Sequence, residues 1–429
     1  MEQNCDVIIV GTGVAGLYCA LNLPEHLQVC ILTKQKAEDA NSFLAQGGIC
    51  VLRGEDDFAD YYEDTMRAGH YENDPKTVEL VLRSSNQVIR DLIRWGVQFD
   101  RDADGHLEYT REGAHSKPRI LYHQDITGQE ITSTLLQRVR ERPNLRILEH
   151  TTMVDLLVQN NRCYGVVAVD EARTPFFLPA GAVVLACGGI GGLYANSTSF
   201  PHITGDALAI ALKHHIALKD LNYVQMHPTT LYSQGKGRKF LISESVRGEG
   251  ALLLDKNGQR FTDELQPRDV VCQAIWKQMQ ADGTDYVWED LRPLGEDVIL
   301  AHFPNIFQQC LQQGYDVRRQ PIPVVPAEHY LMGGIAVDLA SRTSLAGLYA
   351  CGETSCNGIH GRNRLASNSL LESLVFADRA ADDIAFGCHG APEELPHDLS
   401  LSDYQDLDKL FQDYGRAVME QIERLNGHE

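Results

Sequence analysis

The chain has 429 residues, of which 38 are Lys or Arg and 59 are Asp or Glu, so its formal net charge is −21. That length suggests about two or three domains with a substantial core. The excess of acidic residues disfavours nucleic acid and anionic membranes as partners, because like charges repel. No apolar run approaches the ~18 residues that span a bilayer, and residues 1–6 lack the basic start of a signal peptide. We therefore expect a soluble, cytoplasmic protein that captures any anionic ligand locally.

Eleven cysteines are scattered singly along the chain, and none forms a C-x-x-C motif. This pattern argues against a disulfide framework, a zinc ribbon and an iron–sulfur cluster, so we expect no metal site. Most of the cysteines should be small buried residues. The closest pair, Cys351 and Cys356, leaves a redox couple as the less favoured alternative.

Residues 7–32 have the pattern of one βαβ unit. The apolar run at 7–10 is typical of a strand buried on both faces, 17–23 predicts a helix, and 29–32 predicts a second buried strand. Between the first strand and the helix stands a G-x-G-x-x-G motif. In this context the motif predicts dinucleotide binding, with a purely structural turn as the alternative.

Each glycine of the motif has a distinct expected role. Gly11 permits the tight turn, Gly13 lets the backbone approach a pyrophosphate, and Gly16 allows the helix to pack closely on the strand. The helix N-terminus offers free N–H groups to phosphate. After the second strand, NAD-binding folds carry an acid that accepts ribose hydroxyls, but this chain has Lys34. A lysine cannot accept such bonds, which disfavours NAD specifically.

Two later segments have the same strand-and-turn character. A strand and glycine-rich turn occupy 182–189, and a helix opens at 205–207 and runs to about residue 214. The strand at 347–353 ends in Glu353. FAD enzymes of the two-dinucleotide type close the cofactor site with such a late strand, whose acidic end holds ribityl or ribose hydroxyls.

These segments predict an α/β protein with a discontinuous, Rossmann-like FAD-binding domain at 1–225 and 332–386. The intervening stretch, 226–331, differs in composition, and we interpret it as an inserted α+β capping domain. Residues 387–429 form a short C-terminal helical segment, with a Pro-bounded linker and an amphipathic helix near 404–425.

Several ordered segments resemble the flavoprotein family of succinate dehydrogenase, fumarate reductase and L-aspartate oxidase. The resemblance spans about residues 5–386, and the segments that carry it are 41–49 (NSFLAQGGI), 225–229 (QMHPT), 244–250 (ESVRGEG), 267–269 (PRD), 329–334 (HYLMGG) and 364–372 (RLASNSLLE). The C-terminal segment is shorter than the helical domain that family members usually carry.

Three departures favour the aspartate-oxidising branch of this family. Respiratory members attach the flavin to a His in the segment that corresponds to 41–44, and this segment has none, so the FAD should be bound non-covalently. The segment 110–116 resembles the one that carries an acidic residue facing the substrate amine, which maps onto Glu112. The sequence of residues 366–372 is also closer to the matching segment of the aspartate-oxidising branch.

The resemblance implies a C4 dicarboxylate substrate whose C2 hydride passes to flavin N5. Two carboxylates in a chain of charge −21 require fixed cations and hydrogen-bond donors, and a guanidinium matches a carboxylate with two parallel bonds. Arg364, His227 and His329 are the matching positions, with Gln225 beside them. The alternative for each histidine is a structural residue, and for Arg364 a surface charge at a helix start.

By the same resemblance, Arg268 lies over the C2–C3 bond and exchanges the C3 proton through Glu244 and Arg247. Free arginine is almost never deprotonated, so a catalytic arginine needs a neighbouring proton path. The alternative is that 267–269 simply starts a helix that continues over 270–279.

The residues expected to bind FAD come from the segments described above. Backbone donors around 369–371, at a helix start, would stabilise the reduced flavin through the helix dipole. The full set is Gly11, Gly13, Gly16, Lys34, Ser42, Ala45, Gly47, Gly48, Asp206, Glu353, Ser369 and Leu371.

Taken together, the resemblance implies FAD-dependent oxidation of L-aspartate to iminoaspartate, the first step of the aspartate route to NAD, with reoxidation by oxygen or fumarate. The product is unstable in water, so quinolinate synthase is the implied functional partner. Two alternatives stay open: a soluble fumarate reductase or succinate dehydrogenase flavoprotein subunit, and a non-catalytic FAD-binding homologue.

Overall fold

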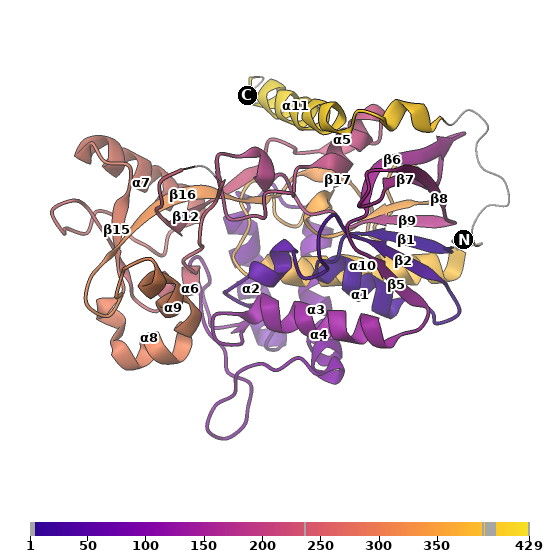
Figure 1. Cartoon of the computed structure of the whole chain (residues 1–429). Coiled ribbons are helices and arrows are strands. Elements are labelled where there is room, and N and C mark those ends of the chain that lie inside the picture. Colours follow the sequence, from indigo (N-terminus) through magenta and orange to yellow (C-terminus); the bar gives the residue numbers. More distant parts are fainter. Residues whose placement is uncertain (1–4, 236, 388–389, 391–399, 428–429) are drawn as a thin grey trace.

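A parallel sheet of five strands forms the centre of the protein, in the order β18-β9-β1-β2-β5 (Figure 1). The computed structural model describes residues 5–235, 237–387, 390 and 400–427. The strands are β1 (Val7–Val10), β2 (Val29–Leu32), β5 (Leu145–Leu148), β9 (Ala182–Leu185) and β18 (Leu348–Ala350). The predicted strands at 7–10 and 29–32 are thus confirmed, and all five carboxyl ends meet at one edge.

Alternation along β1 explains why its sequence is apolar throughout. Val7 and Ile9 pack against the helical side of the sheet, whereas Ile8 and Val10 pack against the opposite side. Because both faces are covered, no position is left for a polar residue. The following helix, α1 (Val14–Asn22), begins earlier than the predicted residue 17, since the helix starts directly after the glycine turn.

Helices cover one face of the sheet and a second, smaller sheet covers the other (Figure 1). The helical layer consists of α1, α2 (Glu55–Ala68), α3 (Pro75–Trp95), α4 (Thr127–Glu141) and α10 (Asn368–Gly387). The opposite layer contains antiparallel strands β6 (Thr152–Gln159), β7 (Arg162–Val169) and β8 (Pro175–Pro179), with α5 (Asp206–Lys213). The helix expected from 205–207 to about 214 is therefore confirmed.

Two further small sheets consist of short strands. They are β3 (Ile49–Cys50) with β4 (Ile120–Leu121), and β11 (Leu218–Lys219) with β17 (Gly334–Ala336) and β19 (Ser355–Cys356).

A further sheet, of six strands, has its own apolar core and lies beside the parallel sheet and its layers, at the left of Figure 1. Its strands are β10 (Asn196–Ser197), β12 (Val224–Leu231), β13 (Gly237–Arg238), β14 (Leu252–Leu254), β15 (Val287–Asp290) and β16 (Ile322–Leu331). Its helices are α6 (Glu244–Gly248), α7 (Arg268–Asp282), α8 (Glu296–His302) and α9 (Pro304–Gln312).

We call the buried residues of this core, which range from Leu231 to Val324, the capping core. This separate core supports our proposal that 226–331 is a capping domain inserted between 1–225 and 332–386. One strand of its sheet, β10, comes from outside the insert.

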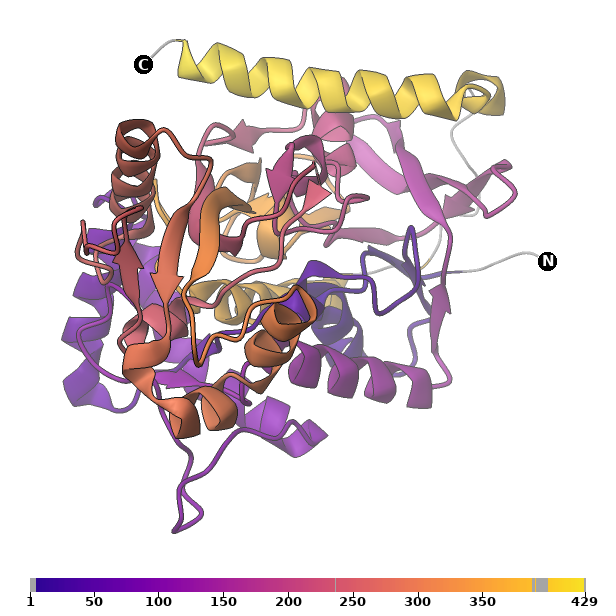
Figure 2. The ribbon, with the colours of Figure 1, turned by 60° about the vertical axis from the view of Figure 1, so that its left-hand side comes forward.

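The C-terminal segment packs on the far side of the small sheet, where Figure 2 shows one long helix crossing the molecule. It contains a short helical turn, Leu401–Tyr404, and α11 (Leu407–Asn426), close to the predicted 404–425. The Tyr404 hydroxyl donates to Asp155 at 2.5 Å, and the Tyr414 hydroxyl donates to the Val154 carbonyl at 2.8 Å. The predicted linker lies largely outside the described residues.

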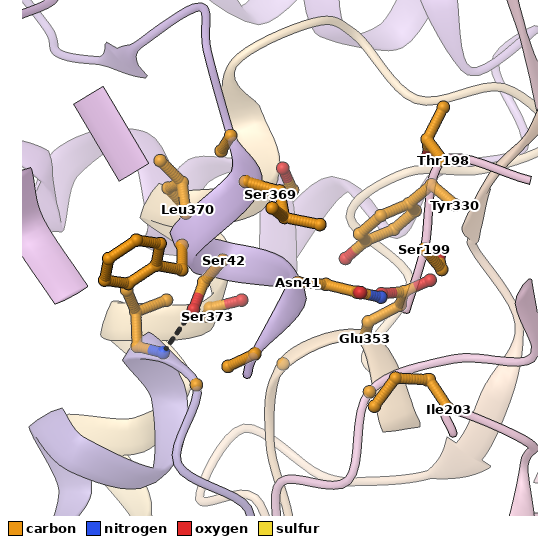
Figure 3. A pocket seen from close by; sticks show the side chains of 18 of the residues that line it. Asn41, Ser42, Thr198, Ser199, Ile203, Tyr330, Glu353, Ser369, Leu370 and Ser373 are labelled. Carbon is orange, nitrogen blue, oxygen red and sulfur yellow. Dashed lines mark hydrogen bonds between the residues drawn. The ribbon is translucent and has the colours of Figure 1, made fainter. Parts of the chain in front are cut away.

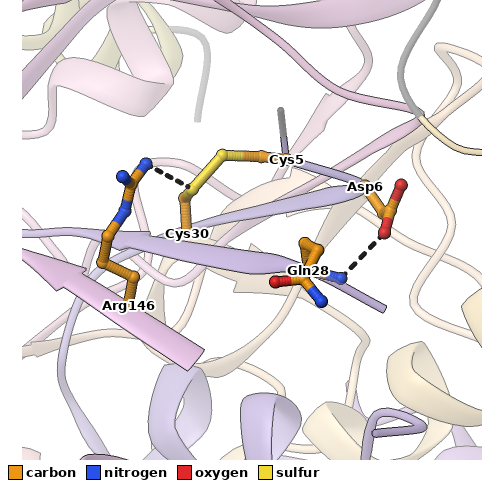
Figure 4. Close-up of a disulfide and its surroundings, with 5 residues drawn as sticks. All are labelled: Cys5, Asp6, Gln28, Cys30 and Arg146. Atoms are coloured by element: carbon orange, nitrogen blue, oxygen red, sulfur yellow. Dashed lines mark hydrogen bonds between the residues drawn. A yellow bond between two sulfur atoms is a disulfide. The ribbon is translucent and has the colours of Figure 1, made fainter. Parts of the chain in front are cut away.

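One cysteine pair departs from the sequence prediction. Cys5, just before β1, forms a disulfide with Cys30 of β2, and Arg146 donates to the Cys30 sulfur at 3.3 Å (Figure 4). The expectation of unpaired cysteines is wrong here, because β1 and β2 are adjacent parallel strands that bring these two positions together. Eight other described cysteines are free and seven of them are buried, including Cys351 and Cys356.

None of the described helices is long and apolar enough to cross a membrane.

Candidate active site

A cavity of about 430 Å³ runs from the carboxyl edge of the parallel sheet to the sheet of the capping core. Segments far apart in sequence line it, and the structure brings together most of the residues that the sequence singled out. Those that line the cavity are Gly11, Gly13, Lys34, Ser42, Ala45, Gly47, Gly48, Glu112, Asp206, His227, Glu244, Arg268, His329, Glu353, Arg364 and Ser369. Four expected residues are not in its lining, namely Gly16, Gln225, Arg247 and Leu371.

The glycine turn at one end of the cavity leaves no room for side chains. Gly11 has φ +119°, and a Cβ there would lie 2.1 Å from the Ala186 carbonyl oxygen. A Cβ on Gly16 would lie 2.1 Å from the Gly11 oxygen, so Gly16 packs helix on strand instead of lining the cavity. At the start of α1, Val14 N donates to Ser42 Oγ at 3.1 Å (Figure 3).

Charged and polar groups also line this end of the cavity. Lys34 forms an ion pair with Asp206 and donates to the His202 carbonyl at 2.9 Å. Glu353 accepts from Leu331 N at 3.0 Å, and burial raises the pKa of its carboxyl to about 7. Figure 3 shows Ser42, Ser369 and Leu370 on one side of the cavity and Thr198, Ser199 and Glu353 on the other.

This set of groups fits a flavin dinucleotide. The α1 N-terminus can bind a pyrophosphate, and an acid at the end of β18 can accept hydroxyls. At the start of α10, Leu370 lines the cavity where Leu371 was expected; Leu371 is fully buried in the helical core.

Arg364 supplies an unneutralised cation to the other end of the cavity. It is 4% exposed, its Nη1 donates to Ser369 Oγ at 3.0 Å, and its guanidinium lies 4.5 Å from the centre of the Tyr330 ring. Within the described part of the chain it has no acidic partner. Burial and then Arg268 lower its pKa to about 10, so it stays charged at neutral pH and can bind a carboxylate.

Two neutral histidines face the same space, with ring centres 5.0 Å apart. Burial, followed by the charge of Arg268, holds the pKa values of His227 and His329 well below the usual range. His227 Nδ1 lies 3.0 Å from the Thr229 carbonyl oxygen and 3.2 Å from Thr229 N, whereas the buried Nε2 has no partner among the described residues. The two rings can therefore contribute hydrogen bonds without adding charge.

Arg268, at the first turn of α7, is held by two groups. Its Nε donates to Glu244 Oε2 at 2.5 Å and its Nη1 donates to Gln225 Oε1 at 2.9 Å. Gln225 in turn donates to Asn363 and to the Arg364 carbonyl, both at 2.8 Å. Gln225 thus joins the two arginines from outside the cavity, which differs from the direct substrate contact that we expected.

Behind Arg268, Arg247 Nη2 lies 3.6 Å from Glu244 Oε2. Burial alone would raise the pKa of Glu244, but the Arg268 and Arg247 guanidinium groups lower it. The three side chains form a contiguous buried line of charged groups, as a proton path requires.

Glu112 is buried on the remaining side of the cavity and is 3% exposed. Ser245 Oγ donates to its Oε1 at 2.9 Å, and Ser367 Oγ donates to its Oε2 at 2.5 Å. Burial and the nearby Glu244 raise the pKa of its carboxyl. A Cβ on Gly47 would lie 2.2 Å from Glu112 Oε1, so a glycine makes room for this acid.

A buried network behind Glu112 holds its loop against the start of α10. Arg119 is fully buried and pairs with Asp57 and Asp64 at 2.9 and 2.7 Å. His115 lies 3.1 Å from Arg119 Nη1 through Nδ1 and 3.0 Å from the Ala366 carbonyl through Nε2. Burial and then Arg119 lower the pKa of His115 to about 4, so it is neutral.

The sequence analysis did not assign roles to Ser245, Ser367 or this network. Ser245 and Ser367 lie inside motifs that the analysis quoted, and their adjacency to Glu244 and Asn368 was the available signal. No periodic pattern distinguishes His115 and Arg119 from ordinary polar loop residues.

Comparison with known proteins agrees with this geometry. A family model described as FAD binding domain matches residues 6–370. The chain is 49% identical to an L-aspartate oxidase of Clostridium acetobutylicum, covering 90% of this chain and 88% of the relative. It is 45% identical to that of Clostridium perfringens, covering 100% and 96%. Escherichia coli quinol fumarate reductase FrdA superposes with a TM-score of 0.85 at 29% identity, over 98% of this chain and 74% of that one.

Proposed function

The chain belongs to the L-aspartate oxidase family, within the FAD binding domain family, and we propose that it oxidises L-aspartate to iminoaspartate with FAD. The observation that carries this proposal is the placement of one buried acid, Glu112, in the same cavity as Arg364 and Arg268. Such a set is complementary to a substrate with two carboxylates and one ammonium group.

Substrate binding follows from the charges of these groups. Arg364 binds one carboxylate, and the neutral His227 and His329 donate to carboxylate oxygens. Glu112 accepts from the ammonium group, whose burial without a counter-charge would cost several kcal/mol. The bonds from Ser245 and Ser367 orient its carboxylate toward that role.

Bound FAD supplies the oxidising chemistry, because it accepts the C2 hydride and passes the electrons on to oxygen or fumarate. Arg268 is held by Gln225 and Glu244, with Arg247 behind Glu244. Direct imine formation releases a proton from the substrate nitrogen, whereas an enamine route would pass the C3 proton to Arg268 and on to Glu244 and Arg247. The ion pair with Glu244 keeps a proton acceptor in contact with the guanidinium, which answers the difficulty of deprotonating an arginine.

The flavin is bound non-covalently in this proposal, since residues 41–44 contain no histidine. The product hydrolyses in water, so we further propose quinolinate synthase as the enzyme that consumes it and the cytoplasm as their shared location. This completes an early step of NAD biosynthesis.

Fumarate reduction or succinate oxidation is the second candidate, because a quinol fumarate reductase shares the fold at a TM-score of 0.85 and the same clamp would hold those substrates. A non-catalytic FAD-binding homologue is the third. An anaerobic titration of the yellow enzyme separates them. Bleaching by L-aspartate supports the first, bleaching by succinate alone the second, and no bleaching by either the third.

A further inference from the structure

Glu289 is an acid in the interior of the capping core. It has no exposed surface and lies opposite Leu253 of β14 and Ile322 of β16. Its strand, β15, is labelled in Figure 1. Both carboxylate oxygens are buried, and neither has a hydrogen-bond partner among the residues that the structure describes. An unpaired charge is costly in such a place, so the acid is held neutral, and burial raises its pKa to about 8.

Arg247 presents the complementary set of atoms. Its side chain is fully buried, and its Nη1 donates to the Glu264 carbonyl at 2.7 Å. Its Nε lacks a hydrogen-bond partner within the described ranges, and its Nη2, which forms the ion pair with Glu244 at 3.6 Å, makes no hydrogen bond either. Both groups adjoin Glu264: Arg247 donates to its carbonyl, and Leu253, the strand partner of Glu289, donates to its carboxylate. The Arg247 charge also opposes the rise in the pKa of Glu289. Since a water molecule binds a few polar groups at once, one water can join these donors to the Glu289 carboxyl.

We propose that Glu289 is a buried proton reservoir for Arg268, acting through Arg247 and Glu244. Glu289 does not touch the substrate. It acts through Arg247 and Glu244, and it extends the line of charged groups into the capping core. The inference rests on the proposed function, because it concerns the proton that Arg268 exchanges with the substrate.

The reduction of fumarate is the step that consumes the Glu289 proton. Bound flavin, when reduced, would supply a hydride to one carbon of the double bond, and Arg268 gives a proton to the other, which yields succinate. Both electrons arrive with the hydride. Arg268 regains its proton from Glu244, Glu244 from Arg247, and Arg247 from Glu289, in concert, so that no arginine stays neutral. Glu289 is left as a carboxylate.

Solvent restores that proton by way of Glu264. The Glu264 carboxylate accepts from Leu253 N at 2.8 Å and pairs with Arg260, whose side chain is 53% exposed. Among the described residues, the charged and titratable groups that face Glu289 are Arg247 on α6, Glu264 after β14 and Cys310 on α9. In this proposal the proton line runs from the cavity through Glu289 and Glu264 to the surface.

Stopped-flow reoxidation of the reduced holoenzyme tests the inference. Fumarate and ferricyanide are compared as acceptors, because only fumarate requires a proton at carbon. In Glu289→Gln we expect reoxidation by fumarate to slow by about 10-fold or more, with a larger solvent deuterium isotope effect. The rate with ferricyanide should be unchanged. Glu289→Leu, which suits the apolar surroundings, should behave in the same way.

Asp290→Asn is the matched control. Asp290 is the next residue on β15, and both its oxygens bind Arg292 at 2.8 Å. The control should keep the wild-type ratio of fumarate to ferricyanide rates. An unchanged fumarate rate in both Glu289 variants, or equal slowing with both acceptors, would overturn the inference. Reduction of the wild-type enzyme by L-aspartate, measured alongside, tests the proposed function separately.

Discussion

Ser367 donates a hydrogen bond of 2.5 Å to Glu112, across 255 positions of sequence. The bond joins the loop that carries the acid to the residues that open α10, where Ser369 and Leu370 line the cofactor end of the cavity. The acid that we assign to the substrate ammonium is therefore positioned by the same segment that we assign to the flavin.

Ser367→Ala should weaken the use of L-aspartate. A hydrogen bond to a charged group contributes ~1.5–3 kcal/mol, so kcat/KM for L-aspartate should fall by about 10-fold or more. Steady-state kinetics with flavin content held constant measures this. Ser233→Ala is the control, because Ser233 is exposed and bonds only to Lys239 in the described structure. Equal losses in the two serine variants would contradict the prediction.

Acid precipitation should release all of the flavin. Residues 41–44 offer no histidine for a covalent bond. After denaturation the absorbance should be found in the supernatant, and its chromatographic mobility should match that of FAD. Flavin that stays with the washed pellet would mean that another side chain bonds to it.

Arg268→Leu should lower turnover by several orders of magnitude while the flavin stays bound. The change removes the group that lies against both Glu244 and Gln225, and with it the positive charge at the site of bond breaking. Rapid-reaction reduction by L-aspartate measures the effect. A rise in KM at constant kcat would assign Arg268 to substrate binding alone.

Deuterium at C3 of aspartate tests the proton role independently. Washout of the label during turnover would support removal of the C3 proton through an enamine, whereas full retention would favour direct formation of the imine. The Arg268 variant should abolish any washout that the wild-type enzyme shows.

The βαβ unit could be predicted from the sequence pattern, whereas the residues of the substrate end were assigned through the family resemblance. Strands buried on both faces are continuous apolar runs, and parallel strands bring their carboxyl ends to one edge. The contacts of Glu112 could not be predicted from the sequence, because single serines give no periodic signal. Ser245, which donates to Glu112, lies 133 positions away along the chain. The Cys5–Cys30 bond depends on strand adjacency, which cysteine spacing does not encode.

His115 should make the protein less stable below about pH 6.5. Its pKa in the folded protein is lowered to about 4, against about 6.5 when unfolded, so the unfolded chain binds a proton that the folded one excludes. The stabilisation is complete above the unfolded value and is lost as the pH falls toward the folded value. By pH 5 the loss should reach about 2 kcal/mol.

Urea unfolding of wild type and His115→Gln at several pH values measures this loss. The amide can keep one hydrogen bond but does not titrate, so the difference in unfolding free energy between the two proteins should shrink from about pH 6.5 to 5. A difference that is independent of pH would show that His115 is protonated in the folded protein as easily as in the unfolded one.

Glu112→Gln tests the choice of aspartate over succinate most directly. The two substrates differ by one ammonium group, and a carboxylate at its position both stabilises that cation and repels a substrate that carries only carboxylates. The amide keeps the shape and removes the charge; its oxygen can still accept from one of Ser245 and Ser367, and the other serine hydroxyl must turn to accept from the NH2 group. We expect kcat/KM for aspartate to fall by about 10- to 100-fold, roughly 1.4 to 3 kcal/mol, while activity on succinate or fumarate holds or rises.

The opposite substrate responses distinguish this effect from a general loss of structure. Damage to the loop would lower activity on both substrates together, and Glu108→Gln, on the same loop but outside the cavity lining, should lower neither. Because burial and Glu244 raise the pKa of Glu112, the aspartate preference of the wild-type enzyme should also decline as the pH falls and the acid is protonated. In Glu112→Gln that decline should be absent. A preference that is the same in both proteins at every pH would assign the ammonium group to another partner.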